Sequence, residues 1–461
     1  MAETQISSGE QVKIISIILE SDRMSQPIEL FALNQDTVVA EFSIYEKIDS
    51  PFLTANMQFL DDVGLYQNVG IRGTERVTIE VASTGSQDED VISKTFIITN
   101  VVSADKVNDY ATMLTVSMIQ DIGFFDRIQR FSKYYDGRGE QIIKKIVSDK
   151  LFSNVDTTNL KESFQAPFRY IVPYQTPLDA VQTVLRKMTT ELGMPYFFFS
   201  TLNNDDFVLT DLETILNDQE QPFNKDYPFV FSQAKTNDTN DFRSLAFTMH
   251  NFESQNMEDT LFLAQTGALG STYNNINITT GATRKTNIDM NSRIQTLVDN
   301  QFIPKEYSNI RIDTEFVPDP SGTNQNSINL YQSRIISELS ASTFPYDKLN
   351  NFSEEENPIF HDVRIVRDNM LKFLTSNIFT AYLPGLSFLW KTNVNTVGSL
   401  INIQVFKNDI VDDARVINDV IDTKRSGNYL ILAKRHLFNV SNDTHNVSIE
   451  ISRITDVGTA I

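Results

Sequence analysis

Histidine is the first residue type to consider for catalysis or metal binding, and the sequence contains four of them: His250, His361, His436 and His445. None lies in an HExxH motif or another paired spacing, and zinc needs three or four ligands. His436 and His445 flank the last predicted turn of the chain, so we expect them to face each other across a hairpin. Cross-strand packing is the favoured interpretation, and no metal site is predicted.

Carboxylate pairs are the second candidate for chemistry, because two suitably spaced carboxyl groups can hydrolyse a glycosidic bond. Each pair lies in polar, turn-like sequence, and a solvated loop is therefore the expected setting. The pairs are Asp61 with Asp62, Asp205 with Asp206, and Asp412 with Asp413.

Motifs for phosphate, nucleophile and calcium chemistry are missing from the sequence. The glycine-rich stretch at 136–141 lacks the Lys-Ser/Thr of a P-loop and is typical of a helix start. No GxSxG occurs, and the EF-hand pattern is absent. Trp390 is predicted to be a packing residue. The sequence therefore predicts no catalytic residue, no cofactor and no enzymatic activity.

Short alternating strands dominate the first part of the chain. They are expected at 38–48, 53–62, 75–83, 94–104 and 110–119, with turn residues between them. Because no long helix separates these strands, an antiparallel barrel or sandwich is favoured over parallel packing. We predict a first β-barrel domain at 1–120.

The hydrophobic period changes to that of helices after residue 123. One helix should bury Ile142, Ile143, Ile146 and Val147. A second should begin at Pro177, with Thr176 as N-cap, and run to Gly193. A hairpin is expected to pair 196–200 with 207–211. This block, at 121–235, is predicted to be an α/β domain.

β patterning returns near residue 242 and again at the end of the chain, where 426–452 forms a regular hairpin. The less regular stretch between them includes 328–341, which is predicted to be helical. The sequence thus favours a second β-barrel domain at 236–290 plus 375–461, split by an inserted mixed domain at 291–374. The predicted fold class is α+β and mainly β, with two antiparallel β-barrels and α/β decoration.

Composition restricts the functional classes further. The 461 residues include no cysteine, which excludes thiolate chemistry and is typical of a protein made in a reducing cytoplasm. No secretory signal and no membrane-spanning run are expected. The net charge of −21 disfavours a broad nucleic-acid-binding face. It either serves solubility or also keeps a passing nucleic acid from adhering.

The order of these blocks resembles the baseplate hub subunit of contractile-tailed, T4-like bacteriophages, which is related to the hub part of type VI secretion spike proteins. Three regions carry the similarity: 42–81, with a Ser-Pro break between two strands; 125–202, with a Thr-Pro helix start and an aromatic strand; and 382–436, leading into the last hairpin. The residues taken as its structural signature are Phe42, Ile44, Pro51, Phe59, Asp61, Pro177, Tyr196, Phe198, Gly385, Gly427, Tyr429 and His436.

The resemblance implies a structural virion protein of the tail baseplate, assembled in the host cytoplasm. Three copies would form a ring that adapts the sixfold tail tube to a threefold spike and surrounds the DNA-exit channel. Its partners would be the spike, the tail tube and the baseplate wedge proteins, with DNA passing through without specific binding and no membrane insertion. Two alternatives stay open: another tail component, such as a wedge or tube initiator, and a tail-associated cell-wall hydrolase.

Overall fold

The computed structural model describes most of the chain, and the fold below refers to these residues only. The described ranges are 10–31, 39–62, 64–83, 91–164, 167–218, 222–231, 246–256, 260–268, 270–277, 283–299, 334–340, 358–390, 395–407, 421–422 and 425–453. Within them, no helix combines the length and the apolar character that crossing a membrane requires.

The N-terminal β unit confirms the strands expected from alternation. In β5, for example, Val77, Ile79 and Val81 are buried while the residues between them are not, as expected for a strand with one face on a core. The strands of this unit are β1 (Val12–Glu20), β2 (Ile28–Phe31), β3 (Val39–Lys47), β4 (Thr54–Asp61), β5 (Arg76–Ser83), β6 (Val91–Lys106) and β7 (Thr112–Gln120). A short π-helical turn, η1 (Leu65–Val69), follows β4.

The C-terminal β unit is built around the predicted last hairpin, which is formed by β20 (Gly427–Asn439) and β21 (Thr444–Arg453). A short turn, η6 (Val440–Asn442), joins its strands. β18 (Ile378–Pro384) pairs with β21, and β14 (Asn251–Asn256) pairs with β18. β19 (Leu400–Val405) pairs with β20 and with β13 (Phe229–Phe231). As expected, strands distant in sequence share this sheet.

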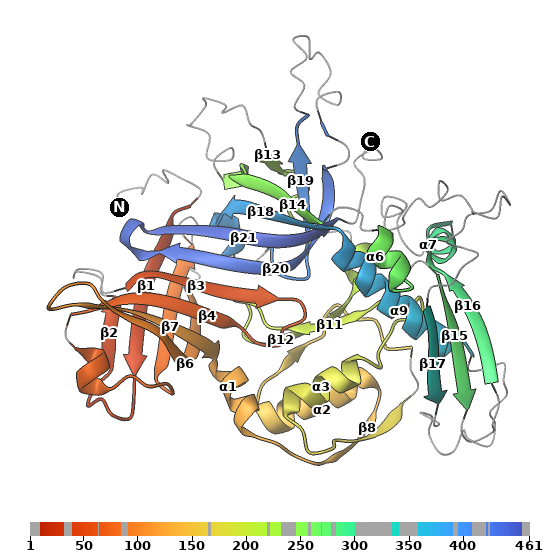
Figure 1. The fold of residues 1–461 in the computed structure, drawn as a ribbon, viewed down its shortest axis with the longest axis horizontal. Helices are drawn as coiled ribbons and strands as arrows, with labels where there is room; N and C mark the ends of the chain where they lie inside the picture. Colours follow the sequence, from red (N-terminus) through yellow and green to blue (C-terminus); the bar gives the residue numbers. More distant parts are fainter. Residues whose placement is uncertain are drawn as a thin grey trace, which may run out of the picture.

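The two β units are not separate. β20 pairs antiparallel with β3, so one sheet runs in the order β14-β18-β21-β20-β3-β4-β7-β6-β5-β1-β2 (Figure 1). A single bridge between Gln11 and Thr444 also brings the start of β1 back to β21. The mainly-β α+β class is confirmed. The described strands form one continuous sheet, and no full ladder among them closes either unit into a barrel.

The middle block supports the sheet from below in Figure 1. Its helices are α1 (Asp121–Ile128), α2 (Gly139–Leu151), α3 (Pro177–Leu185) and α4 (Leu212–Asn217). Its short strands are β8 (Tyr134–Gly137), β9 (Val155–Asp156), β10 (Phe168–Ile171), β11 (Tyr196–Phe199) and β12 (Phe207–Asp211). The predicted apolar stripe of α2 is buried, and β11 pairs with β12 as expected.

Helix α3 begins as predicted and ends earlier than predicted. The Thr176 side chain accepts a hydrogen bond from the backbone N–H of Asp179, and Pro177 is the first helical residue. The predicted end at Gly193 is wrong, since the helix stops at Leu185. There the guanidinium of Arg367 donates to the backbone carbonyls of Leu185 and Arg186. This side chain satisfies carbonyls that a further turn would have used.

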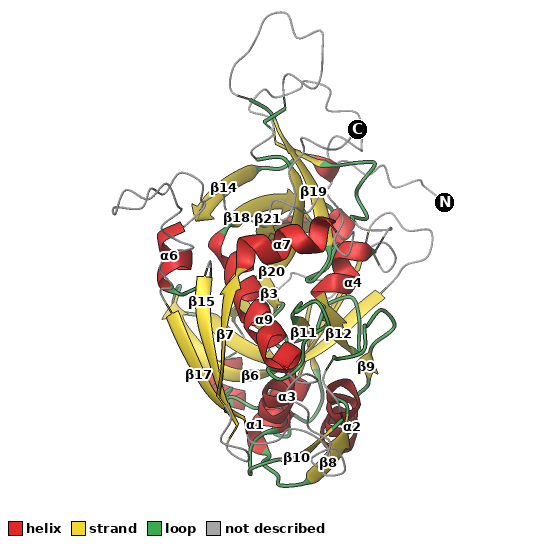
Figure 2. Ribbon diagram, turned by 90° about the vertical axis from the view of Figure 1, so that its right-hand side faces the viewer, coloured by secondary structure: helices red, strands yellow, loops and turns green. Residues whose placement is uncertain are grey.

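The prediction of a helix at 328–341 is wrong where the structure describes it. Residues Arg334–Ser340 form β17, which pairs parallel with β15 (Gly270–Asn277), itself paired with β16 (Thr283–Asp289). This three-stranded sheet stands beside α6 (Thr260–Gln265), α7 (Met290–Asp299) and α9 (Pro358–Ser376) (Figures 1 and 2). β15 and β16 therefore belong to a separate sheet, although Tyr273 and Ile288 pack in the same core as the C-terminal β unit.

The apolar residues gather in three cores. One fills the N-terminal β unit, one fills the C-terminal β unit together with α9, and one lies in the middle block between α2, α3 and its short strands. The predicted domain boundaries stay a prediction. Parts of the predicted insertion, at 300–333 and 341–357, lie outside the described residues, as does the stretch at 242–245 where β patterning was expected to return.

Candidate functional site

The seam between β3 and β20 is the most unusual feature of the fold. In its register Glu46 lies opposite Lys434, Ile44 opposite His436, and Phe42 opposite Phe438. Alternation places these six side chains on one face of the sheet, and all six are buried. The seam thus passes from aromatic contacts in the N-terminal core to charged groups near the C-terminal core.

The Glu46 carboxylate is the centre of this seam. Its Oε1 accepts hydrogen bonds from the Leu202 N–H at 2.9 Å and from His436 Nε2 at 3.2 Å. Lys434 Nζ lies 3.2 Å from Oε2, and both side chains are fully excluded from solvent. Oε2 has no hydrogen bond of good geometry, so the contact with Lys434 is an ion pair and not a directed hydrogen bond. Glu46 thereby joins β3, β20 and the loop before β12.

The two histidines extend the network across the hairpin. His436 Nδ1 and His445 Nε2 are 2.8 Å apart, and the rings stack at a centroid distance of 5.0 Å. A carboxylate only accepts, so His436 must donate through Nε2. Its neutral ring then accepts at Nδ1, and His445 donates through Nε2. We assign both tautomers from this chain of donors and acceptors.

A glycine makes room for the end of this chain. A Cβ placed on Gly385 would lie 2.1 Å from His445 Nδ1 and 2.5 Å from the His445 carbonyl oxygen. The Gly385 N–H also donates to that carbonyl, at 2.9 Å. On its other side, His445 stacks on Phe438 at 4.3 Å, and Phe438 stacks on Phe42 at 4.5 Å. The His445 imidazole is therefore enclosed between Gly385 and the Phe438 ring.

Burial and charge set the protonation of the network. Burial alone would raise the pKa of Glu46, but the charge of Lys434 and the hydrogen bonds from His436 and Leu202 outweigh it and lower that pKa to about 2. The pKa of His436 is lowered to about 4, mainly by burial and to a smaller extent by the charge of Lys434. Burial, with the charges of His436 and Lys434, holds the pKa of His445 well below its usual value. Burial lowers the pKa of Lys434, although the charge of Glu46 opposes this shift. At neutral pH the seam thus holds the Glu46–Lys434 pair beside two neutral histidine rings.

We expect acid to open this seam. In the unfolded chain His436 would bind a proton near pH 6.5, but in the folded protein it does so only near pH 4. Between these values the unfolded state binds more protons, so stability falls as the pH falls. His436 alone should contribute on the order of 3 kcal/mol over this window. Glu46 adds to the loss below pH 4.5 in the same direction.

Thermal unfolding measured from pH 7 to pH 4.5 checks this expectation. The midpoint should fall as the pH falls, and His436→Gln should flatten the slope while lowering stability at pH 7. His250→Gln is the matched control, because the His250 side chain is half-exposed and, in the described part of the chain, forms its ion pair with Glu10. A slope that is unchanged in His436→Gln would show that the acid sensitivity arises elsewhere.

The network can hold strands together, and its role in register follows from its geometry. Shifting β3 by one residue along β20 would turn every inward side chain of β3 to the other face. Glu46 would then leave Lys434 and His436 without their acceptor, and unpaired buried charges are costly. We interpret the seam as the device that fixes how the two β units are joined.

The structure places most of the residues that the sequence singled out for chemistry. His436 and His445 face each other as predicted, and they hydrogen-bond to one another. Asp205 is exposed and pairs with Lys94 at 2.6 Å. The expectation of a solvated loop is wrong for Asp61, which is buried and accepts from the N–H groups of Leu65 and Tyr66. Asp412 and Asp413 lie outside the described residues.

The glycine-rich stretch is a helix start, as predicted. Arg138 is the N-cap residue of α2, and its N–H donates to the Gln141 side chain. Trp390 is half-buried, and its carbonyl accepts from the Asn203 side chain at 3.0 Å. Within the ranges given above, no three His, Asp or Glu side chains come together as a metal site would need.

The signature residues fall into four places. Phe42, Ile44, Gly385 and His436 meet at the seam. Phe59 and Asp61 lie on β4, and Gly427 and Tyr429 open β20. The others belong to the middle block or contact it: Pro177 begins α3, Tyr196 and Phe198 lie on β11, and the Pro51 carbonyl accepts from Ser200 at 2.9 Å. Their shared role as a family signature stays a prediction.

Sequence reasoning missed Glu46 and Lys434, although a signal was present. Both residues occupy inward positions of strands that were predicted correctly. Glu46 follows Phe42 and Ile44 at a spacing of two, and Lys434 precedes His436 and Phe438 at the same spacing. A charged residue in the phase of buried ones indicates a buried partner of opposite charge. The pairing of β3 with β20 was not predicted, so the partner could not be named.

Comparison with known proteins gives structural neighbours at low identity. No protein-family model matches the sequence, and the search of the curated proteins returned no match. In fold, the chain is similar to phage tail proteins and to proteins related to VgrG of type VI secretion.

Particular structures illustrate this similarity. A tail protein from Neisseria meningitidis is 11% identical, with 95% of this chain and 96% of that one covered and a TM-score of 0.49. The 43 kDa tail protein of prophage MuSo2 from Shewanella oneidensis is 10% identical, with 95% and 98% covered and a TM-score of 0.49. A PdpA–VgrG complex from Francisella gives 9% identity, 98% and 54% coverage, and a TM-score of 0.45. At such values, function has to be argued from the residues of this chain.

Proposed function

We propose that this protein is a structural subunit of a phage tail baseplate, namely its central hub. Three copies would form a ring that adapts the sixfold tail tube to a threefold spike and encloses the channel through which DNA leaves. The class of protein comes from the sequence resemblance in 42–81, 125–202 and 382–436. The protein is proposed to act by assembly and not by catalysis.

The observation that carries this proposal is the pairing of β3 with β20. An adaptor between two symmetries must hold its two halves in a fixed relation, since any hinge between them would let the ring distort. The two β units of this chain are joined by seven register pairs between β3 and β20. They are also joined by the buried network of Glu46, Lys434, His436 and His445. One subunit can then present two similar units to the tube, and a ring of three subunits would present six.

The charge of the chain fits passage of DNA without adhesion. With a net charge of −21, acidic residues on the channel wall would repel phosphates over roughly 8–10 Å at physiological salt. The spike, the tube and the wedge proteins would contact the outer faces of the ring. A strongly positive channel wall in the assembled ring would contradict this part of the proposal.

Light scattering after size exclusion tests the assembly. The chain co-expressed with the neighbouring tail genes should elute with three copies of its 52.4 kDa mass per complex, together with the spike protein. A complex with one copy, or with six, would favour a wedge or tube-initiator role instead.

Zymography on peptidoglycan tests the non-enzymatic part of the proposal. No clearing is expected. Clearing that disappears with Asp205→Asn and Asp206→Asn would replace the hub proposal with the hydrolase alternative.

A further inference from the structure

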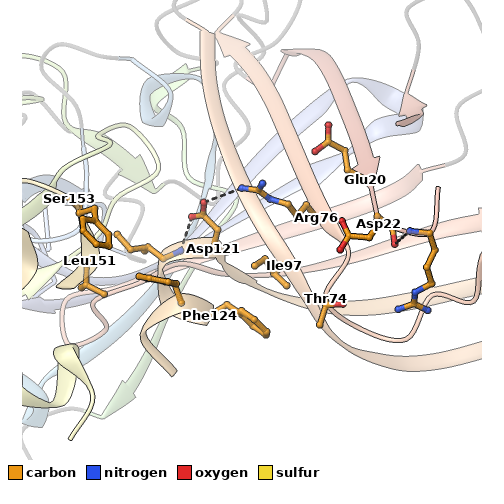
Figure 3. A pocket seen from close by; sticks show the side chains of 14 residues that line it. Glu20, Asp22, Thr74, Arg76, Ile97, Asp121, Phe124, Leu151 and Ser153 are labelled. Atoms are coloured by element: carbon orange, nitrogen blue, oxygen red, sulfur yellow. Dashed lines mark hydrogen bonds and ion pairs between the residues drawn. The ribbon is translucent and has the colours of Figure 1, made fainter. Parts of the chain in front are cut away.

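A cavity of about 820 Å³ lies between the N-terminal β unit and the middle block. One wall is the end of β1 with the turn that follows it, together with parts of β5 and β6. The other wall is α1 and the end of α2 (Figure 3). The seam described above does not reach it. The two walls differ in character, and this difference restricts what can bind between them.

The strand wall carries unpaired negative charge. Glu20 and Asp22 are exposed and have no ion-pair partner among the residues that the structure describes. The two arginines of the cavity are already engaged. Arg76 pairs with Asp121 at 3.9 Å, and Arg23 binds the Gly70 carbonyl and the Glu75 carboxylate. The charge left for a ligand on this wall is therefore negative.

The helix wall presents apolar groups to solvent. Phe152 is 80% exposed, and its ring lies 6.3 Å from that of Phe125, which is itself 39% exposed. Ile128, one helical turn beyond Phe125 on α1, is 67% exposed. Large apolar side chains gathered at one place on a surface are typical of an interaction site.

The backbone of Phe152 supports the same interpretation. This residue ends α2 with φ at +52°, a conformation in which glycine or asparagine is the usual choice. A phenylalanine at this positive φ costs stability. Because its side chain is held out into solvent, burial of the ring does not offset that cost. Its ring is thus best explained by contact with something outside the part of the chain that the structure describes.

We propose that this cavity is a docking site for a lysine- or arginine-bearing segment of a partner protein. The cationic head would pair with Glu20 and Asp22, and the apolar stem would lie against the rings of Phe152 and Phe125. Side chains of this kind combine a long aliphatic stem with a charged end, and aromatic rings attract both. An acidic segment would be repelled by the strand wall, and a purely apolar segment would match the helix wall alone.

Fluorescence anisotropy with labelled peptides tests the proposal on the purified full-length chain. The probe is the pentapeptide Leu-Lys-Leu-Arg-Leu, and its counterpart has glutamate at both charged positions. We expect saturable binding of the basic peptide and none of the acidic one. Phe152→Asn should weaken binding about tenfold, which corresponds to about 1.4 kcal/mol. Asparagine accepts the backbone conformation of this site, so the variant should fold normally.

Charge variants and matched controls complete the test. The double variant Glu20→Gln, Asp22→Asn should also bind about tenfold more weakly and with less salt dependence. Tyr110→Asn is the aromatic control, since Tyr110 is 89% exposed on the β6–β7 turn far along the strand. Glu191→Gln is the charge control on an exposed residue. Equal binding by all variants would mean attraction to net charge alone and would overturn the proposal, as would no binding up to about 1 mM peptide.

Discussion

Glu46→Gln is expected to lower the free energy of unfolding by about 3–5 kcal/mol, because it leaves the Lys434 ammonium buried without a counter-ion. Glutamine keeps a carbonyl that can accept from the Leu202 N–H, so the loss reports mainly on charge. Urea unfolding followed by the fluorescence of Trp390, the single tryptophan, measures it. That probe is close to the seam. The Asn203 side chain donates to the Trp390 carbonyl, and the preceding residue, Leu202, donates its N–H to Glu46.

A double-mutant cycle separates the ion pair from general damage to the core. Lys434→Met alone should also destabilise, because the Glu46 carboxylate then loses its cation. In the double variant Glu46→Gln, Lys434→Met the two losses should not add, and at least half of the stability lost in the worse single variant should return. Lys47→Met is the control on the neighbouring, solvent-facing position of β3, with a change within about 0.5 kcal/mol. Additive losses would show that the two charges do not act on each other.

Gly385→Ala is expected to cost about 3 kcal/mol, although alanine differs from glycine by one methyl group. The added Cβ would overlap both the ring and the backbone carbonyl of His445. Overpacking of this kind costs about 1–3 kcal/mol, and turning the His445 ring away would break its hydrogen bond to His436 and add about 1 kcal/mol. Gly385 has a φ of −83°, so backbone strain does not contribute.

The readout that distinguishes this effect is the histidine signal itself. With only four histidines in the chain, nitrogen NMR should show a change at His436 and His445 in Gly385→Ala and none at His250. Gly70→Ala is the control, because its Cβ would meet only arginine side-chain atoms, at 3.7 Å or more. Its cost should be about 1 kcal/mol, from the positive φ of Gly70. Equal effects of both substitutions would argue against the close contact at Gly385.

Local features of the fold could be predicted where neighbouring residues decide the structure. The start of α3 follows from Thr176, Pro177 and Asp179, whose capping contacts lie within one turn. The last hairpin follows from strict alternation. The two histidines flank its turn and meet diagonally, since His436 lies opposite Val447 and His445 opposite Phe438. In each of these cases the residues that determine the structure are close in sequence.

Features decided by distant residues were missed. α3 stops at Leu185, where the guanidinium of Arg367, far along the chain, donates to the carbonyls of Leu185 and Arg186. β17 was predicted to be a helix because a short apolar run fits either period. Its parallel partner β15 is distant in sequence, so the local pattern did not indicate the pairing. The seam was missed for the same reason, since the partners Glu46 and Lys434 can be matched only once β3 is known to pair with β20.

Electron cryo-microscopy of the co-expressed tail assembly tests the central claim most directly. The account predicts three copies of this chain around one channel, each joined internally through β3 and β20, so that six similar β units face the tube. A chain found singly at the periphery of the assembly, or one in which β3 and β20 belong to units that move independently, would contradict it.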